Sequence, residues 1–214
     1  MSRPRVLIAD DHRLLADAYE GILGERCQVV GKVGDGRELL TQASELRPDV
    51  IVLDISMPRL NGLEAAKRLK EILPEARLVF VTMHKDARMA ARALDAGASA
   101  YVPKASAASE LVDAVTCVLR GETYVTPRLK SSEIESARRL PTREGRRLTP
   151  RQREVLQLLA EGKLMKQVAR ELGLSTRTVA HHKYTLMREQ GLESNAELVQ
   201  LAIEEGLIAP PTPP

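Results

Sequence analysis

Cysteine is scarce in this chain of 214 residues, and long apolar runs are absent. The two cysteines, Cys27 and Cys117, lie far apart, in no CxxC pair and near no histidine cluster. Their placement predicts neither a disulfide framework nor a zinc site. No apolar run approaches the roughly 20 residues that span a bilayer, and the first residues do not form a secretory signal. We therefore expect a soluble, cytoplasmic protein with no membrane partner.

Positive charge is concentrated in the second part of the chain. Residues 1–126 carry 17 basic and 18 acidic side chains, a net charge of −1. Residues 127–188 carry 15 basic and 6 acidic side chains, a net charge of +9, whereas residues 189–214 carry 5 acidic and no basic ones. A basic block of this kind favours a polyanion as partner, although a merely solvated surface has the same composition.

The first 120 residues alternate short β-branched runs with longer amphipathic segments. This alternation predicts an α/β fold with a doubly wound, five-stranded parallel sheet and helices on both faces. The predicted strands are Arg5–Ala9, Gln28–Val33, Val50–Leu53, Leu78–Thr82 and Ala100–Val102.

The pattern then changes twice. Residues 127–147 are rich in arginine and poor in apolar side chains, which predicts an interdomain linker, with room for a short helix over Leu129–Arg139. Residues 148–208 show only helical periodicity and predict a small all-α domain. Residues 209–214 are mostly proline and predict a disordered tail. The α/β segment that comes before the linker, residues 1–126, is the first predicted domain.

Polar side chains follow the predicted strands at their carboxyl ends. Asp10 and Asp11 follow the first strand, Asp54 the third and Lys104 the fifth, while Thr82 ends the fourth. Because these ends meet at one edge of a parallel sheet, we expect one site. Three carboxylates would repel one another unless a hard cation lies among them, and Mg²⁺ fits best. Helix capping explains any single aspartate, but it does not explain the lysine or the acidic pair.

Over about residues 3–122 the chain resembles the receiver domain of two-component response regulators. The matching residues are Asp10-Asp11, Leu53-Asp54-Ile55-Ser56-Met57-Pro58 with Asn61-Gly62, Val81-Thr82-Met83-His84, Tyr101 and Lys104. The resemblance implies the flavodoxin-like strand order 2-1-3-4-5. It also implies that Asp54 takes a phosphoryl group from a histidine kinase or a phosphotransfer protein. Mg²⁺ would be bound by Asp11, Asp54 and the Ser56 carbonyl, and by Asp10 through water.

The chemistry of phosphoryl transfer assigns roles to the remaining polar residues. Lys104 and the metal neutralise charge on the phosphoryl oxygens. Thr82 then donates to one of these oxygens, and the Tyr101 ring turns into the space that the moving loop leaves. Simple packing is the alternative role for Tyr101. One position departs from the family, because Pro103 precedes Lys104 and Ala105 follows it, so the cis-proline brace is missing.

The all-α segment carries a helix-turn-helix pattern. Thr149 and Pro150 begin a first helix, Met165–Leu172 forms a second, and a third runs from Ser175 to about Gln190. Residues 147–206 resemble the LuxR-type domain of the NarL/FixJ subfamily. The matching residues are Leu148-Thr149-Pro150-Arg151, Glu154-Val155-Leu156, Ala160-Glu161-Gly162, Val168-Ala169, Leu172-Gly173-Leu174-Ser175, Arg177-Thr178-Val179, His182 and Leu192, with departures at Leu164-Met165 and Gln190.

The third helix is the predicted DNA reader. Val179, His182 and Leu186 are spaced to face the core, and His182 fits a packing role better than a base contact. The predicted DNA contacts are Arg177, Thr178, Ala180, His181, Lys183, Tyr184, Thr185 and Arg188. Of these, Ala180 either meets a thymine methyl group or contacts nothing. Leu198, Leu201 and Ala202 lie on a last helix, Asn195–Glu205. The resemblance implies that this helix pairs with a second copy. Closing the domain core is the alternative role, and the two roles are compatible.

These features predict a DNA-binding response regulator and not an enzyme. Phosphorylation of Asp54 would release the DNA-binding domain and favour dimerisation on double-stranded DNA, with RNA polymerase as a further candidate partner. A constitutive DNA-binding regulator whose receiver does not switch is the first alternative. A phosphatase or phosphotransferase that uses an aspartyl nucleophile is the second, but it leaves the helix-turn-helix unexplained.

Overall fold

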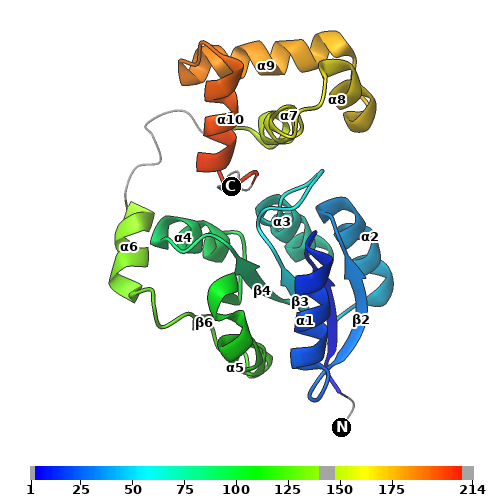
Figure 1. Cartoon of the computed structure of the whole chain (residues 1–214), viewed down its shortest axis with the longest axis vertical. Coiled ribbons are helices and arrows are strands. Elements are labelled where there is room, and N and C mark those ends of the chain that lie inside the picture. The colour runs from blue at the N-terminus through cyan, green and yellow to red at the C-terminus, as the bar shows by residue number, and fades with distance from the viewer. Residues whose placement is uncertain (1–2, 140–147, 209–214) are drawn as a thin grey trace.

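A computed structural model describes residues 3–139 and 148–208, which form an α/β part and a helical part (Figure 1). The strands of the α/β part are β1 (Arg5–Ala9), β2 (Gln28–Val33), β3 (Val50–Leu53), β4 (Arg77–Thr82), β5 (Ala100–Pro103) and β6 (Tyr124–Val125). Its helices are α1 (Arg13–Leu23), α2 (Gly36–Leu46), α3 (Gly62–Ile72), α4 (Ala87–Asp95), the short 3₁₀ turn η1 (Lys104–Ser106), α5 (Ala107–Leu119) and α6 (Ser131–Arg139).

The strands form one parallel sheet in the order β2-β1-β3-β4-β5-β6. The predicted fold class is confirmed, but the predicted number of five strands was wrong, because β6 adds a sixth beside β5. A two-residue strand is too short to produce a periodic pattern in the sequence. It is held by the backbone of its neighbour, through hydrogen bonds such as that from Thr126 N to the Tyr101 carbonyl.

Apolar side chains cover both faces of the sheet. On one face Leu39 of α2, Leu63 of α3 and Met89 of α4 pack against alternate strand residues. On the other face α1 and α5 contribute Tyr19 and Leu111. All four residues of β3 are buried, as expected for a central strand between two helical layers.

Helix α6 lies within the segment that was predicted to be a linker, and it packs against α4. Its Ile134 is only 5% exposed and belongs to the core shared with α2, α3 and α4. The division into residues 1–126, 127–147, 148–208 and 209–214 remains a prediction. Residues 140–147 of the predicted linker and the predicted tail lie outside the described residues.

The helical part consists of α7 (Pro150–Ala160), α8 (Met165–Leu172), α9 (Thr176–Gln190) and α10 (Asn195–Glu204). Helix α7 begins with a capping box in which the Thr149 hydroxyl accepts from Gln152 N and the Gln152 side chain accepts from Thr149 N. Leu156 and Leu186 join α10 in one core cluster, and Val155 and Val179 join α8 in another. Two small cores therefore hold α7 between α8 and α10.

Cys27 and Cys117 are both free thiols. Among the described helices, none has the length and apolar character that crossing a membrane requires.

Candidate functional site

The carboxyl ends of β1, β3 and β5 bring two carboxylates and one ammonium group together. Lys104 Nζ lies 2.7 Å from Asp10 Oδ2 and 2.9 Å from Asp54 Oδ2. All three side chains are almost fully buried, with 2–3% of each exposed. Lys104 begins η1 directly after β5, so it reaches the pocket with proline before it rather than after it. The described residues contain no cis peptide bond.

Burial and charge act against each other in this pocket. Burial raises the pKa of the Asp54 carboxyl, and the Lys104 ammonium only partly offsets this effect. Burial alone would lower the pKa of Lys104, but Asp54 and Asp10 outweigh it and raise that pKa. The second oxygen of Asp54, Oδ1, is buried and has no hydrogen-bond partner among the described residues. A polar atom left in this state is suited to bind something from outside the chain.

Helix capping does not account for the acidic residues of the pocket. Asp35, Asn61 and Asp86 cap the N-termini of α2, α3 and α4, whereas the N-cap of α1 is His12, which makes no side-chain capping bond. Asp10 Oδ1 accepts from His12 N over 2.9 Å at the start of α1. Capping does not explain why Asp10 Oδ2 and Asp54 Oδ2 both pair with Lys104.

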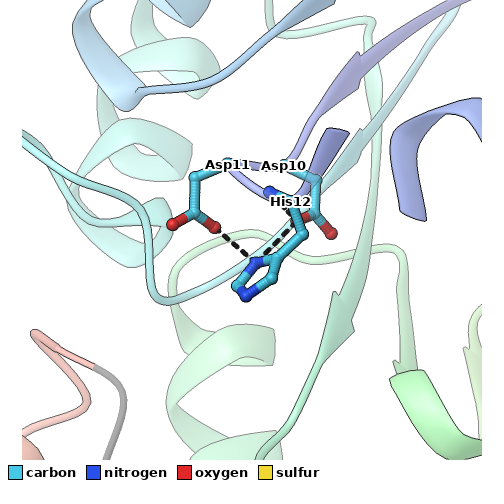
Figure 2. A group of neighbouring side chains, drawn as sticks. All are labelled: Asp10, Asp11 and His12. Carbon is cyan, nitrogen blue, oxygen red and sulfur yellow. Dashed lines mark hydrogen bonds and ion pairs between the residues drawn. The ribbon is translucent and has the colours of Figure 1, made fainter. Parts of the chain in front are cut away.

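Figure 2 shows Asp10 and Asp11 on either side of the His12 ring. His12 Nδ1 lies 2.8 Å from Asp11 Oδ1 and 3.4 Å from Asp10 Oδ1. One ligand atom from each of the three residues lies within 4.8 Å of the others, a spacing that could hold a metal ion. Asp10 and Asp11 were predicted as metal ligands. His12 was not, because the sequence alone does not show that its ring turns back toward both carboxylates.

The loop between β3 and α3 folds back onto Asp54. Gly62 N donates to the Ile55 carbonyl over 2.7 Å, and a Cβ atom at Gly62 would lie 2.0 Å from the Asp54 carbonyl oxygen. Only glycine permits this approach. Within the loop, Ser56 Oγ lies 3.3 Å from His84 Nε2, so the loop also touches the segment that follows β4.

The predicted switch residues Thr82 and Tyr101 are both fully buried. Thr82 Oγ1 accepts from His84 N over 3.3 Å, and the Tyr101 hydroxyl donates to the His84 carbonyl over 2.9 Å. Tyr101 thus already points inward in this structure. That phosphorylation moves these residues stays a prediction. His84, which connects both of them to Ser56, belongs to the motif Val81-Thr82-Met83-His84, but no role for it was predicted from the sequence.

All eight predicted DNA contacts of helix α9 are exposed or half-buried. Arg177, His181 and Arg188 are exposed, and Tyr184 is 59% exposed. Val179 and Leu186 are buried in the domain core, as predicted. His182 is half-buried, and burial lowers its pKa.

The residues predicted for dimerisation lie in the core of their own domain. Leu198, Leu201 and Ala202 are at most 5% exposed and pack with Leu156 and Leu186. Val199 is the large apolar residue that α10 exposes, with 36% of its surface accessible. That these three residues pair with a second copy stays a prediction, which came from the family resemblance.

The doubly wound sheet with acidic residues and a lysine at its strand ends, joined to a helix-turn-helix, defines the class of DNA-binding response regulators. Comparison with known families agrees. Residues 6–116 match the response regulator receiver domain, and residues 146–202 match the bacterial regulatory proteins of the luxR family. The chain belongs to the two-component response regulators with a LuxR-type helix-turn-helix.

Relatives match along almost the whole chain. The transcriptional activator protein ExaE of Pseudomonas putida is 33% identical over 95% of this chain and 97% of its own length. The oxygen regulatory protein NreC of Staphylococcus epidermidis is 35% identical over 95% of this chain and 99% of its own length. A structure of the RcsB response regulator of Salmonella typhimurium superposes with a TM-score of 0.66 at 27% identity, over 97% of this chain and 100% of that one.

RcsB of Salmonella enterica serovar Typhimurium has also been solved bound to the promoter rprA in the presence of the phosphomimetic BeF₃⁻. That structure has a TM-score of 0.64 and 27% identity, and the match covers 92% of this chain and 98% of that one.

Proposed function

We propose that phosphorylation of Asp54 by a partner histidine kinase, or by a phosphotransfer protein, controls dimerisation and promoter binding by this regulator. The observation that carries the proposal is the buried Asp54 carboxylate, which has one oxygen paired with Lys104 and the other unpartnered. In the transfer, an Asp54 oxygen forms a bond to phosphorus while the bond from phosphorus to the donor imidazole nitrogen breaks. The imidazole leaves as the neutral ring after it takes up a proton.

The residues present fit a magnesium ion. Carboxylate and carbonyl oxygens are its preferred ligands. Asp11, Asp54 and the Ser56 carbonyl would supply them, and Asp10 would bind the ion through water. When bound, Mg²⁺ would neutralise charge on the phosphoryl oxygens.

The chain's own residues do the remaining work. The Lys104 ammonium, raised in pKa by Asp54 and Asp10, stays charged and would pair with a phosphoryl oxygen. The Thr82 hydroxyl would exchange its bond from His84 N for one to the phosphoryl group. Because Tyr101 bonds to the His84 carbonyl, a shift of this segment would be passed to β5 and to α4.

DNA binding would use α9 in the major groove. Arg177, Thr178 and Lys183 would contact phosphates, Arg188 lies on the same exposed face, and His181, Tyr184 and Thr185 would read base edges. Ala180 would meet a thymine methyl group or nothing. A DNA-binding regulator of this kind would act in the cytoplasm, with RNA polymerase as a further partner, and would not be an enzyme.

A second candidate function is constitutive DNA binding with a receiver that does not switch. Two observations favour it: Tyr101 is already buried, and α9 lies on the far side of the helical part from the receiver (Figure 1).

Incubation with acetyl phosphate and Mg²⁺ tests both proposals. We expect the wild type to gain the mass of one phosphoryl group, and Asp54→Asn to gain none. Asp113→Asn, at an exposed position of α5, is the matched control and should behave like the wild type. Phosphorylation that leaves DNA affinity and oligomeric state unchanged would favour the constitutive regulator, and absence of any modification at Asp54 would reject the first proposal.

A further inference from the structure

The loop that follows Asp54 is held by a residue of the DNA-binding domain. Gln157, on α7, is only 1% exposed. Its Nε2 donates to the Met57 carbonyl over 2.7 Å, and its Oε1 accepts from Asn61 N over 3.0 Å. A single side-chain amide thus satisfies one acceptor and one donor on the backbone of the loop.

Neighbouring contacts fix the amide in this position. Glu161, which directly follows the last residue of α7, accepts both from Gln157 Nε2 over 3.0 Å and from Arg59 N over 3.1 Å. Arg68 of α3 pairs with Glu154 of α7. The loop is therefore bound at Met57 and Asn61 by Gln157 of α7, and at Arg59 by Glu161 at the C-terminal end of this helix.

Further contacts join the two parts away from α7. Arg92 of α4 lies 3.0 Å from Glu205 at the end of α10, and Arg37 of α2 donates to the Glu171 carbonyl over 3.1 Å. Gly206, with a φ of +61°, lies against Met89 and Ile55. The loop that contains Ile55 and Met57 is thus contacted by Gln157 of α7 and approached by Gly206 in the turn that follows α10.

We propose that Gln157 is a positioning residue for the phosphoacceptor loop, and that its docked position weakens binding of Mg²⁺ and a phosphoryl group at Asp54. The inference rests on the proposed function of Asp54. Ser56, whose carbonyl is a proposed metal ligand, lies between Ile55 and Met57, and the carbonyl of Met57 is fixed by Gln157. A ligand that requires the loop to turn must break the bonds to the amide.

The direction of the effect follows from linkage. If the phosphoryl group and its metal loosen the docked domain, the docked domain must weaken their binding by the same factor. Loss of the Gln157 amide should therefore tighten binding at Asp54, although Gln157 touches none of the reacting atoms.

Beryllofluoride with Mg²⁺ provides an equilibrium test, because it binds without turnover. We expect Gln157→Ala to bind beryllofluoride about tenfold more tightly than the wild type in ¹⁹F NMR titrations of the full chain, within the usual range of coupling between two sites. Gln42→Ala, on α2 and outside the interface, is the matched control and should bind like the wild type. Gln157→Glu places a carboxylate against the Met57 carbonyl and Glu161, and should tighten binding at least as much.

Arg68→Glu opens the same interface from the receiver side while α7 keeps its sequence. It sets a carboxylate against Glu154 and should tighten beryllofluoride binding in the same direction, whereas Arg120→Glu at the exposed end of α5 should not. If a substitution at Gln157 unfolds α7, beryllofluoride binding by Arg68→Glu still tests whether docking weakens binding at Asp54.

The outcomes separate the two proposals. Unchanged or weaker binding in Gln157→Ala and in Arg68→Glu, with normal binding in the wild type, would overturn the role of Gln157. Failure of the wild type and of every variant to bind beryllofluoride would instead reject Asp54 as phosphoacceptor.

Discussion

At the scale of single residues, Lys104 holds the pocket together. Its ammonium lies between Asp10 and Asp54, and both carboxylates are buried. Breaking a buried ion pair costs about 3–5 kcal/mol, because the remaining charge loses its partner. The same ammonium competes with a cation for the carboxylate oxygens. Lys104 is thus both a stabilising group and a competitor of the metal.

We expect Lys104→Met to lower the free energy of unfolding by about 3 kcal/mol in the absence of divalent cations. Mg²⁺ should restore part of the loss, because a ligand that binds only the folded state stabilises it. Urea unfolding with and without Mg²⁺ measures both effects, with Lys166→Met at an exposed position of α8 as control. Equal stabilisation by Mg²⁺ in the variant and the wild type would show that the ammonium does not compete with the metal.

Two glycines provide a matched pair at the same scale. A Cβ atom at Gly62 would lie 2.0 Å from the Asp54 carbonyl oxygen, whereas one at Gly21, inside α1, would meet nothing within 4 Å. Gly62→Ala should lower the free energy of unfolding by about 2–3 kcal/mol, as backbone clashes do. Gly21→Ala should raise it by about 0.5–1 kcal/mol, because alanine favours a helix. Thermal unfolding compares them, and equal effects would contradict the close approach of the loop to Asp54.

At the scale of helices and strands, α6 behaves as a part of the receiver. We expect Ile134→Ala to lower the free energy of unfolding by about 2–4 kcal/mol, as for other buried isoleucines. Leu14→Ala, at a position 85% exposed, should change it by less than about 0.5 kcal/mol. Urea unfolding followed by circular dichroism measures both. A neutral Ile134→Ala would mean that α6 contributes nothing to the receiver core.

The elements that the sequence predicted best are those whose own residues carry the signal. β1, β2 and β3 have the predicted bounds. For the buried strands β1 and β3, the reason is that an apolar, β-branched run is required wherever helices cover a strand on both sides. β2 lies at the edge of the sheet and is only partly buried. β6 was missed, since its two residues are placed by pairing with β5. The sequence alone predicted that Asp10, Asp54 and Lys104 share one site, because parallel strands align their carboxyl ends. Gln157 could not, because its partners lie about a hundred residues away and depend on how the two parts dock.

At the scale of the whole molecule, the docked arrangement leaves the predicted DNA contacts of α9 without polar contacts to the described residues of the receiver. The interface uses α7, α8 and the end of α10 instead. Docking therefore restrains α10. This helix exposes Val199. Pairing of α10 with a second copy would bring two α9 helices to successive half-sites. Control would then act on dimerisation rather than on access to bases.

This arrangement predicts how the gain in DNA affinity depends on the DNA. With paired half-sites selected from random duplexes, beryllofluoride should raise the DNA affinity more than tenfold. With a single half-site, it should raise the DNA affinity by less than about twofold. The difference is expected because linked sites gain from effective concentration. Val199→Asp should abolish the gain in affinity at paired sites and leave single-site binding unchanged. Ile72→Asp, at an exposed position of α3, is the control and should change neither the gain at paired sites nor single-site binding. Fluorescence anisotropy at fixed salt measures these affinities, since phosphate contacts make them salt-dependent. An equal gain at single half-sites would mean that docking shields α9 itself, and α10 would lose its assigned part in control.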